Sequence, residues 1–252
     1  MTTSGAGGPI IPDYGGANVR GIIPALLGPS SWESDLPAWM PAPVASAKAV
    51  VVMVLDGLGW DQLREHRELM PRVAAMVGGP IHTVAPTTTA TALTSITTGL
   101  TPAEHGIVGY RMVLGGEVMN VLRWYVGDQA VRRSHPPREV QPFEPFLGRT
   151  VPVVSMAELQ SSAFSDAHLR GSDQVGWRAA SSIAVQARRE VEAGEHFVYC
   201  YYGGIDQIAH ERGFGDFCGA ELRAADRRGG ELLVTLAAES ARLGRADAGQ
   251  GL

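Results

Sequence analysis

A run of six apolar residues that ends in a carboxylate constrains the fold of this chain more than any other feature. Val50–Leu55 reads VVVMVL and is followed directly by Asp56 and Gly57. A continuous apolar run of this length is typical of a strand that is buried on both faces in a parallel sheet. Open α/β sheets bind their ligands beyond the carboxyl ends of such strands, which is where Asp56 lies. Asp56 is therefore either a metal ligand or a helix cap, and the run alone does not choose between the two.

Composition and charge limit the class of protein. The chain has 252 residues, 45% of them hydrophobic, which is enough for one large α/β domain. A net charge of −5 argues against a surface that binds a nucleic-acid polymer. Neither a signal peptide nor an apolar stretch of transmembrane length is visible, so we expect a cytoplasmic protein without a membrane partner. The two cysteines are too few for a Cys-rich metal site.

A second apolar run also leads into a carboxylate. Phe197–Tyr202 is followed by two glycines, an isoleucine and Asp206, and His210 comes four residues later. If both runs are strands of one parallel sheet, Asp56 and Asp206 project at the same edge. An Asp and a His four residues apart share one face of a helix, so both side chains can reach one cation. The alternative is that Asp206 caps a helix and His210 merely follows.

The spacing of apolar residues predicts strands that alternate with helices. We expect strands at 49–55, 81–85, 150–156 and 197–202, helices at 60–76 (broken by Pro71), 90–98 and 183–193, and a hairpin at 109–124. Gly99 is suited to end the helix at 90–98. This alternation indicates an α/β fold with a largely parallel sheet that helices cover on both faces.

A threonine-rich segment lies between the predicted strand at 81–85 and the helix that follows it. Residues 86–99 read PTTTATALTSITTG, which places a hydroxyl at the beginning of a helix. That position favours anions, because the first backbone N–H groups of a helix are free. Beside a divalent metal, such a hydroxyl loses its proton more readily and becomes a nucleophile. For most of these threonines, capping or packing is the simpler role.

These elements, together with the stretch GLTPAEHGIVG at 99–109, resemble the alkaline phosphatase superfamily. The chain is most similar to the type I phosphodiesterase/nucleotide pyrophosphatase family and its bacterial alkaline-phosphatase-like branch, over residues 45–215. The resemblance implies an alkaline-phosphatase-like fold and a hydrolase that acts on a small phosphorylated substrate. His105, within the signature stretch, is expected to order its turn rather than to bind a metal.

The resemblance also implies roles for individual residues. The nucleophile is expected at Thr89, with Thr88 as the alternative, and hydrolysis is expected to pass through a phospho-threonine. Members of the family use two divalent cations, usually Zn²⁺, with Mn²⁺ as the alternative. Asp56 and Thr89 would face one cation, and Asp206 and His210 would face the other.

Two features depart from the family pattern. Ala92 stands where the nucleotide pyrophosphatase branch has an Asn that helps hold the phosphate, which weakens an inference to nucleotide diesters. No histidine follows His210, and none of the later aspartates precedes a histidine. Four ligand groups cannot fill two zinc sites, so we expect incomplete metal sites and weak metal binding.

The departures leave two interpretations open: a metal-dependent phosphoric-ester hydrolase, or a catalytically inactive truncated fragment or pseudoenzyme of the same fold. Sulfatase or phosphomutase chemistry is a lesser alternative. Sulfatases have a Cys- or Ser-based motif at the position of the nucleophile, and this chain has Thr89 there. We expect a chain that is truncated or frame-shifted and that lacks the C-terminal strands. The expected segments are a leader and N-terminal segment at 1–44, an incomplete catalytic domain at 45–235 and an atypical, partly disordered tail at 236–252.

Overall fold

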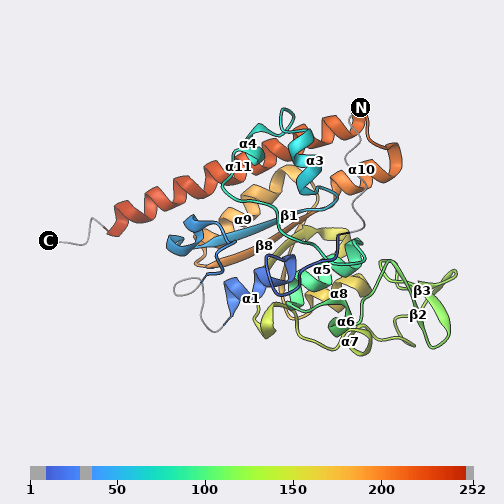
Figure 1. The fold of residues 1–252 in the computed structure, drawn as a ribbon. Coiled ribbons are helices and arrows are strands. Elements are labelled where there is room, and N and C mark those ends of the chain that lie inside the picture. Colours follow the sequence, from blue (N-terminus) through green and yellow to red (C-terminus); the bar gives the residue numbers. More distant parts are fainter. Residues whose placement is uncertain (1–9, 29–35, 248–252) are drawn as a thin grey trace.

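The computed structural model describes residues 10–28 and 36–247, with side chains described as far as residue 232. A parallel sheet lies at the centre, helices cover it, and a smaller antiparallel sheet projects from one side (Figure 1). This arrangement confirms the predicted α/β fold with a parallel sheet and flanking helices.

Four parallel strands form the central sheet. They are β1 (Val50–Leu55), β6 (Pro152–Met156), β7 (Asp173–Trp177) and β8 (Phe197–Tyr202), in the order β1-β8-β6-β7. Leu55 at the end of β1 pairs in register with Tyr202 at the end of β8. The segments that follow these two strands therefore leave the sheet side by side at the same edge.

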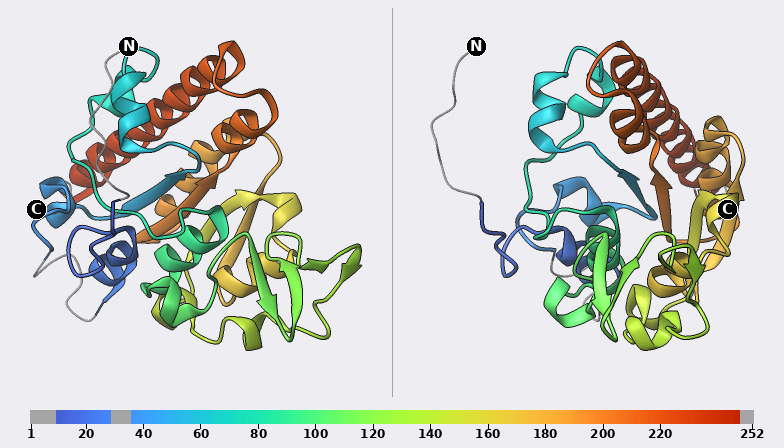
Figure 2. Two further views of the ribbon diagram at one scale, coloured as in Figure 1. Left: turned by 45° about the vertical axis from the view of Figure 1, so that its right-hand side comes forward. Right: turned by 90° about the vertical axis from the view of Figure 1, so that its right-hand side faces the viewer.

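Helices pack on both faces of the sheet because side chains of each strand alternate between two cores. Phe197 and Tyr199 of β8 belong to a cluster with residues of α1 (Ile22–Leu27), α5 (Thr89–Thr98) and α8 (Ala163–Leu169). Val198 and Cys200 belong to a second cluster with residues of α9 (Ile183–Glu192) and α11 (Asp216–Asp247). Figure 2 shows α11 along one side of the sheet and α5 on the other.

The remaining helices are short. They are η1 (Val19–Gly21), η2 (Ala42–Ser46), α3 (Trp60–Glu65), α4 (Pro71–Ala74), α6 (Pro102–His105), α7 (Pro137–Val140), η3 (Pro145–Gly148), η4 (Ala157–Leu159), η5 (Ala180–Ser182) and α10 (Gly204–Arg212). The predicted helix at 60–76 is divided into α3 and α4, and α4 starts at Pro71, which fits the first position of a helix. Gly99 ends α5 in the left-handed conformation, with φ of 75°, as predicted.

The predicted hairpin at 109–124 is confirmed. Strands β2 (Arg111–Leu114) and β3 (Glu117–Asn120) pair antiparallel, and β4 (Tyr125–Val126) and β5 (Gln129–Ala130) extend the same sheet. The turn between β2 and β3 consists of Gly115 and Gly116, with φ of 58° and 86°. Two central residues with positive φ match the twist of a hairpin, and glycine adopts that conformation without strain.

Two expectations about individual elements were wrong, and one strand was not predicted. The run at 50–55 is not buried on both faces: all six residues keep intermediate exposure, because β1 is an edge strand. No strand forms at 81–85. This segment lies between two prolines, and within it His82 alone makes an isolated bridge, with Asn18. Strand β7 was not predicted, because its sequence, DQVGW, shows no clear apolar alternation.

The helix near the N-terminal end of the described chain packs against α5. Ile23, Leu26 and Leu27 of α1 are buried in the same cluster as Leu93 of α5. At the other end α11 continues to Asp247, beyond the expected limit at 235. The division into 1–44, 45–235 and 236–252 stays a prediction, and residues 248–252 lie outside the described part. No helix within the described residues combines the length and the apolar character that crossing a membrane requires.

Two buried histidines are held neutral by the fold. His105 is fully buried; its Nδ1 accepts a hydrogen bond from the Ile107 N–H (3.1 Å), so Nε2 donates to the Ser95 Oγ (2.8 Å). The ring thus ties the turn after α6 to α5, as expected. His168 of α8 donates from Nδ1 to the Phe164 carbonyl (2.7 Å). Burial is the main cause that lowers the pKa of each histidine from 6.5 to about 4.

The two histidines predict a loss of stability on mild acidification. In the unfolded chain each ring binds a proton below pH 6.5, whereas in the fold it stays neutral until the pH reaches about 4. The free energy of unfolding should therefore fall between pH 7 and pH 5, by on the order of 2 kcal/mol for each histidine. Urea unfolding at pH 7, 6 and 5 measures this slope. His105→Gln should reduce the slope by about half, and an equal slope in this variant would contradict the assignment.

Candidate active site

The two aspartates meet at the edge of the sheet. Asp56 continues β1 by one residue, and its backbone N–H donates to the Tyr202 carbonyl (3.0 Å). Asp206 lies in the first turn of α10, and its backbone N–H donates to the Asp56 carbonyl (3.2 Å). Gly57 makes this approach possible: with φ of 81°, a side chain there would place a Cβ only 2.6 Å from the Asp206 Cα. The glycine after Asp56 is thus needed for the contact between the two carboxylate-bearing turns.

The threonine-rich segment forms the start of α5, and Thr89 is its one threonine that lines a cavity with these aspartates. Thr88 is the N-cap of α5 and Thr89 is its first helical residue. The Thr88 Oγ1 is 3.0 Å from the Thr91 Oγ1, within hydrogen-bond distance, and Thr91 is fully buried. Thr94 bonds instead to a carbonyl of the preceding turn, that of Ala90. Most hydroxyls of this helix therefore serve packing and local hydrogen bonding, as the sequence suggested.

Asp56, Thr89 and Asp206 line one cavity of about 300 Å³, between α5 and the ends of the central strands. His210 is not among the lining residues; its Nε2 lies 3.5 Å from the Asp206 Oδ1, and its side chain is 80% exposed. The structure therefore brings together three of the four predicted site residues and places the fourth at the outer side of Asp206. Their roles stay predictions.

Tyr201 belongs to this site and was missed at the sequence level. Its hydroxyl donates a hydrogen bond to the Asp56 Oδ2 (2.8 Å), and its side chain lines the same cavity. Burial, followed by the charge of Asp56, raises the pKa of Tyr201, so the hydroxyl stays a donor. The sequence contains a signal for this position. Alternation along β8 puts Tyr201 on the same face of the sheet as Tyr199 and Phe197, and its position just before the two glycines places it at the carboxyl end of the strand.

Two tyrosine-to-phenylalanine variants should show how much the hydrogen bond of the Tyr201 hydroxyl contributes to stability. Tyr201→Phe removes a donor to a carboxylate and should lower the free energy of unfolding by about 1–2 kcal/mol. Tyr199→Phe is the matched control on the same strand, because the Tyr199 hydroxyl is buried without a partner among the described residues. Its removal should leave stability unchanged or raised. Urea unfolding of both variants measures the difference, and equal losses would contradict it.

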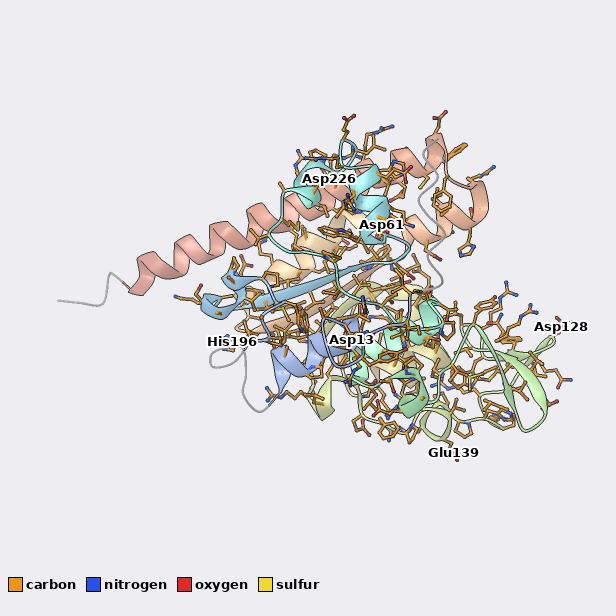
Figure 3. The ribbon with its side chains drawn as sticks, in the orientation of Figure 1. Asp13, Asp61, Asp128, Glu139, His196 and Asp226 are labelled. Carbon is orange, nitrogen blue, oxygen red and sulfur yellow. The ribbon has the colours of Figure 1, made fainter. Side chains whose placement is uncertain are left out.

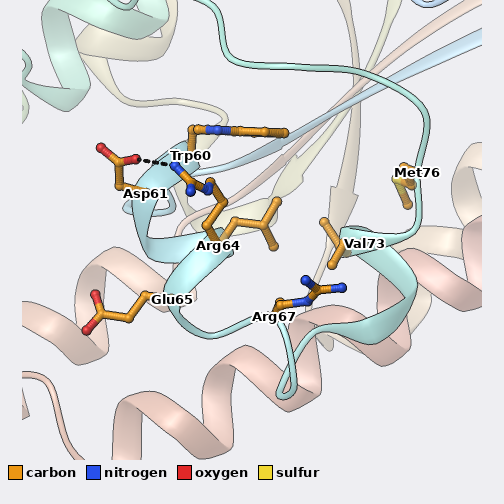
Figure 4. A pocket seen from close by; sticks show the side chains of 9 residues that line it. Trp60, Asp61, Arg64, Glu65, Arg67, Val73 and Met76 are labelled. Atoms are coloured by element: carbon orange, nitrogen blue, oxygen red, sulfur yellow. Dashed lines mark ion pairs between the residues drawn. The ribbon is translucent and has the colours of Figure 1, made fainter.

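A larger cavity of about 860 Å³ lies elsewhere, along α3 and α4 (Figure 4). Its wall carries the exposed ion pair between Asp61 and Arg64, whose charged atoms are 3.8 Å apart. None of the predicted site residues lines it. Size alone therefore does not identify the active site here.

Comparison with known proteins agrees with this geometry. Residues 50–242 match the family described as type I phosphodiesterase / nucleotide pyrophosphatase. This chain belongs to that family. No protein with a curated function matches the sequence significantly.

Two solved structures share the fold of this phosphodiesterase-family chain. Both are of murine ectonucleotide pyrophosphatase / phosphodiesterase 5, one of them an inactive threonine-to-alanine variant in complex with AMP. Each has 16% sequence identity and a TM-score of 0.54, and covers 75% of this chain. The chain spans about half (52%) of the length of the murine protein in those structures.

Membership in the family implies dependence on divalent metal ions, and the site fits this in part. Burial, followed by the nearby charge of Asp56, raises the pKa of Asp206. Two carboxylates suit one hard divalent cation that also keeps water or phosphate oxygens as ligands. However, no three His, Cys, Asp or Glu side chains gather within the described residues to hold a metal ion. Among other acidic residues, Asp61 and Asp226 lie in the region of α3 and α4, whereas Asp128 lies on the projecting antiparallel sheet (Figure 3). The described residues thus do not fit a pair of protein-bound cations.

Proposed function

We propose that this chain hydrolyses phosphoric diesters or pyrophosphate bonds, with the Thr89 hydroxyl as nucleophile. The observation that carries this proposal is the shared cavity of Thr89, Asp56 and Asp206. The inactive murine protein is a threonine-to-alanine variant in complex with AMP. This supports the proposal of a threonine nucleophile and of a small nucleotide-like substrate.

The chemistry follows from the position of Thr89. Its Oγ1 would attack the phosphorus, the bond to one ester oxygen would break, and the alcohol would leave with a proton. Water would then cleave the phospho-threonine and regenerate the hydroxyl. Thr89 begins a helix of ten residues, so the free N–H groups of the first turn of α5 would stabilise the negative phosphoryl oxygens.

We further propose that Asp56 and Asp206 hold one divalent cation, Zn²⁺ or Mn²⁺, with water or phosphate oxygens as its remaining ligands, while His210 lies at the outer side of Asp206. The cation would supply the positive charge that the two carboxylates lack and would lower the pKa of the threonine hydroxyl. Tyr201 orients the Asp56 carboxylate through its hydrogen bond. The other interpretation, an inactive relative of the same fold, is not favoured by the family match.

The experiment is hydrolysis of p-nitrophenyl phosphate and of its phenyl and thymidine diesters, with EDTA, Zn²⁺ or Mn²⁺. We expect release of p-nitrophenol from the diesters, its loss with EDTA and its recovery with metal. Faster hydrolysis of the monoester would identify a phosphatase instead. Calorimetric titration with Zn²⁺ should give a stoichiometry of one rather than two. Failure of folded protein to hydrolyse any of these esters above buffer, at any metal concentration, would refute the proposal.

A further inference from the structure

The cavity of about 860 Å³ along α3 and α4 is separate from the site of Thr89, since none of the described residues lines both. Large apolar side chains of this cavity lie at the surface: Trp60 is 40% exposed and Met76 is 43% exposed. Val77, next to Met76, is 70% exposed. A gathering of large apolar side chains in contact with water marks a surface that a ligand or a partner covers.

The apolar floor of the cavity is fixed by the core beneath it. Leu63 of α3 and Val73 of α4 line the cavity and also pack against the buried cluster that contains Met70. The Asp226 side chain holds α4 in place, because it accepts hydrogen bonds from the backbone N–H groups of Arg72 and Val73. The cavity thus lies between two helices that are each anchored to the core, and it is formed before a ligand arrives.

The charged side chains around the cavity point in different directions. Asp61 and Glu65 are four residues apart on α3 and share one face of it. Figure 4 shows both carboxylates pointing away from Val73, whereas the Arg67 guanidinium lies beside Val73. The charge of Arg64 is directed to Asp61 at 3.8 Å, but Arg67 has no ion pair within the part of the chain that the structure describes. An anionic group in the cavity would therefore find a cation beside an apolar surface.

We propose that this cavity binds an apolar organic acid, with its apolar body against Trp60 and Met76 and its carboxylate at Arg67. The volume lies within the range of small-molecule sites, roughly 300–1,000 Å³. A guanidinium pairs with a carboxylate through two parallel hydrogen bonds, and an indole ring offers a flat apolar surface. Aryl acids and straight-chain acids share this chemistry. The proposal does not depend on catalysis at Thr89.

Calorimetric titration with small acids tests the site. The probes are octanoate and 4-phenylbutyrate, with octylammonium and acetate as controls. We expect saturable binding at one site for at least one of the two acids. Octylammonium has the opposite charge and acetate lacks the apolar body, so each should bind at least about tenfold more weakly. The tighter of the two acids identifies a straight-chain or an aryl ligand. Absence of saturable binding of both acids to the folded protein, or equal affinity for octanoate and octylammonium, would overturn the proposal.

Variants of the cavity wall show where the acid binds. Arg67→Gln should weaken binding about fivefold, and Trp60→Ala about tenfold or more. Arg178→Gln is the matched control, because Arg178 is also an exposed arginine but does not line the cavity. It should leave the affinity unchanged. With all variants shown to be folded by circular dichroism, the same loss in Arg178→Gln as in Arg67→Gln, or full affinity in Trp60→Ala, would overturn the assignment.

Tryptophan fluorescence locates the ligand independently of any activity. Octanoate does not absorb in the range of tryptophan, and its binding should shift the emission of Trp60 to shorter wavelength, because the indole ring leaves water. The shift should disappear in Trp60→Phe and persist in Trp39→Phe, since Trp39 does not line this cavity. A shift that persists in Trp60→Phe would place the acid elsewhere and overturn the proposal.

Discussion

Thr89→Ala is expected to lower diester hydrolysis at least about a thousandfold, because the substitution removes the proposed nucleophile and leaves only the surrounding charges to act. The fold should tolerate the change: Thr89 is the first residue of α5, and alanine has a higher helix propensity than threonine. The loss should therefore appear in kcat, while circular dichroism and the midpoint of urea unfolding stay close to those of the wild type.

Thr88→Ala is the matched control for this experiment. Thr88 is adjacent, has the same side chain and is the N-cap of α5, but its side chain makes no cap hydrogen bond and does not line the cavity. Its activity should stay within about fivefold of the wild type. Acid quenching during turnover, followed by mass spectrometry, should find phosphate on the peptide with Thr89 in the wild type only. Equal losses in the two variants, or a phosphate on Thr88, would contradict the assignment.

Asp226→Ala is expected to cause the largest loss of stability, about 2–4 kcal/mol. The Asp226 side chain is only 2% exposed, and its Oδ1 accepts hydrogen bonds from the backbone N–H groups of Arg72 (2.8 Å) and Val73 (2.9 Å). These are free donors of the first turn of α4, whose own N-cap, Met70, has no polar side chain. Removal of the carboxylate would leave both donors without an acceptor.

Two further variants make the Asp226 result specific. Asp226→Asn keeps one side-chain acceptor and should recover part of the lost stability. Asp61→Ala removes an aspartate whose side chain is 91% exposed and pairs with the exposed Arg64, and it should change stability little. Urea unfolding at pH 7 measures all three variants. Similar losses for Asp61→Ala and Asp226→Ala would show that burial at α4 is not the cause.

The sequence was sufficient for those features that depend on local periodicity and on the ends of elements. The apolar runs at 50–55 and 197–202 form parallel strands of one sheet, so Asp56 and Asp206 come to the same edge whatever the order of the strands. The start of α5 at Thr89 and its end at Gly99 follow from side-chain and backbone preferences within a few residues. The two turns of the site and the helix that carries Thr89 could therefore be located from local sequence alone.

The tertiary structure decided what depends on neighbours distant in sequence. It placed β1 at the edge of the sheet, although its composition suits a buried strand, because strand order is set by long-range packing. It provided Asp226 as the cap for a helix 154 residues earlier in the chain, which local patterns do not reveal. It also formed the cavity at the ends of the central strands, in which Asp56, Thr89 and Asp206 come together. Local sequence fixes which residues can bear chemistry, whereas the shape of the space between them arises only when separate elements pack together.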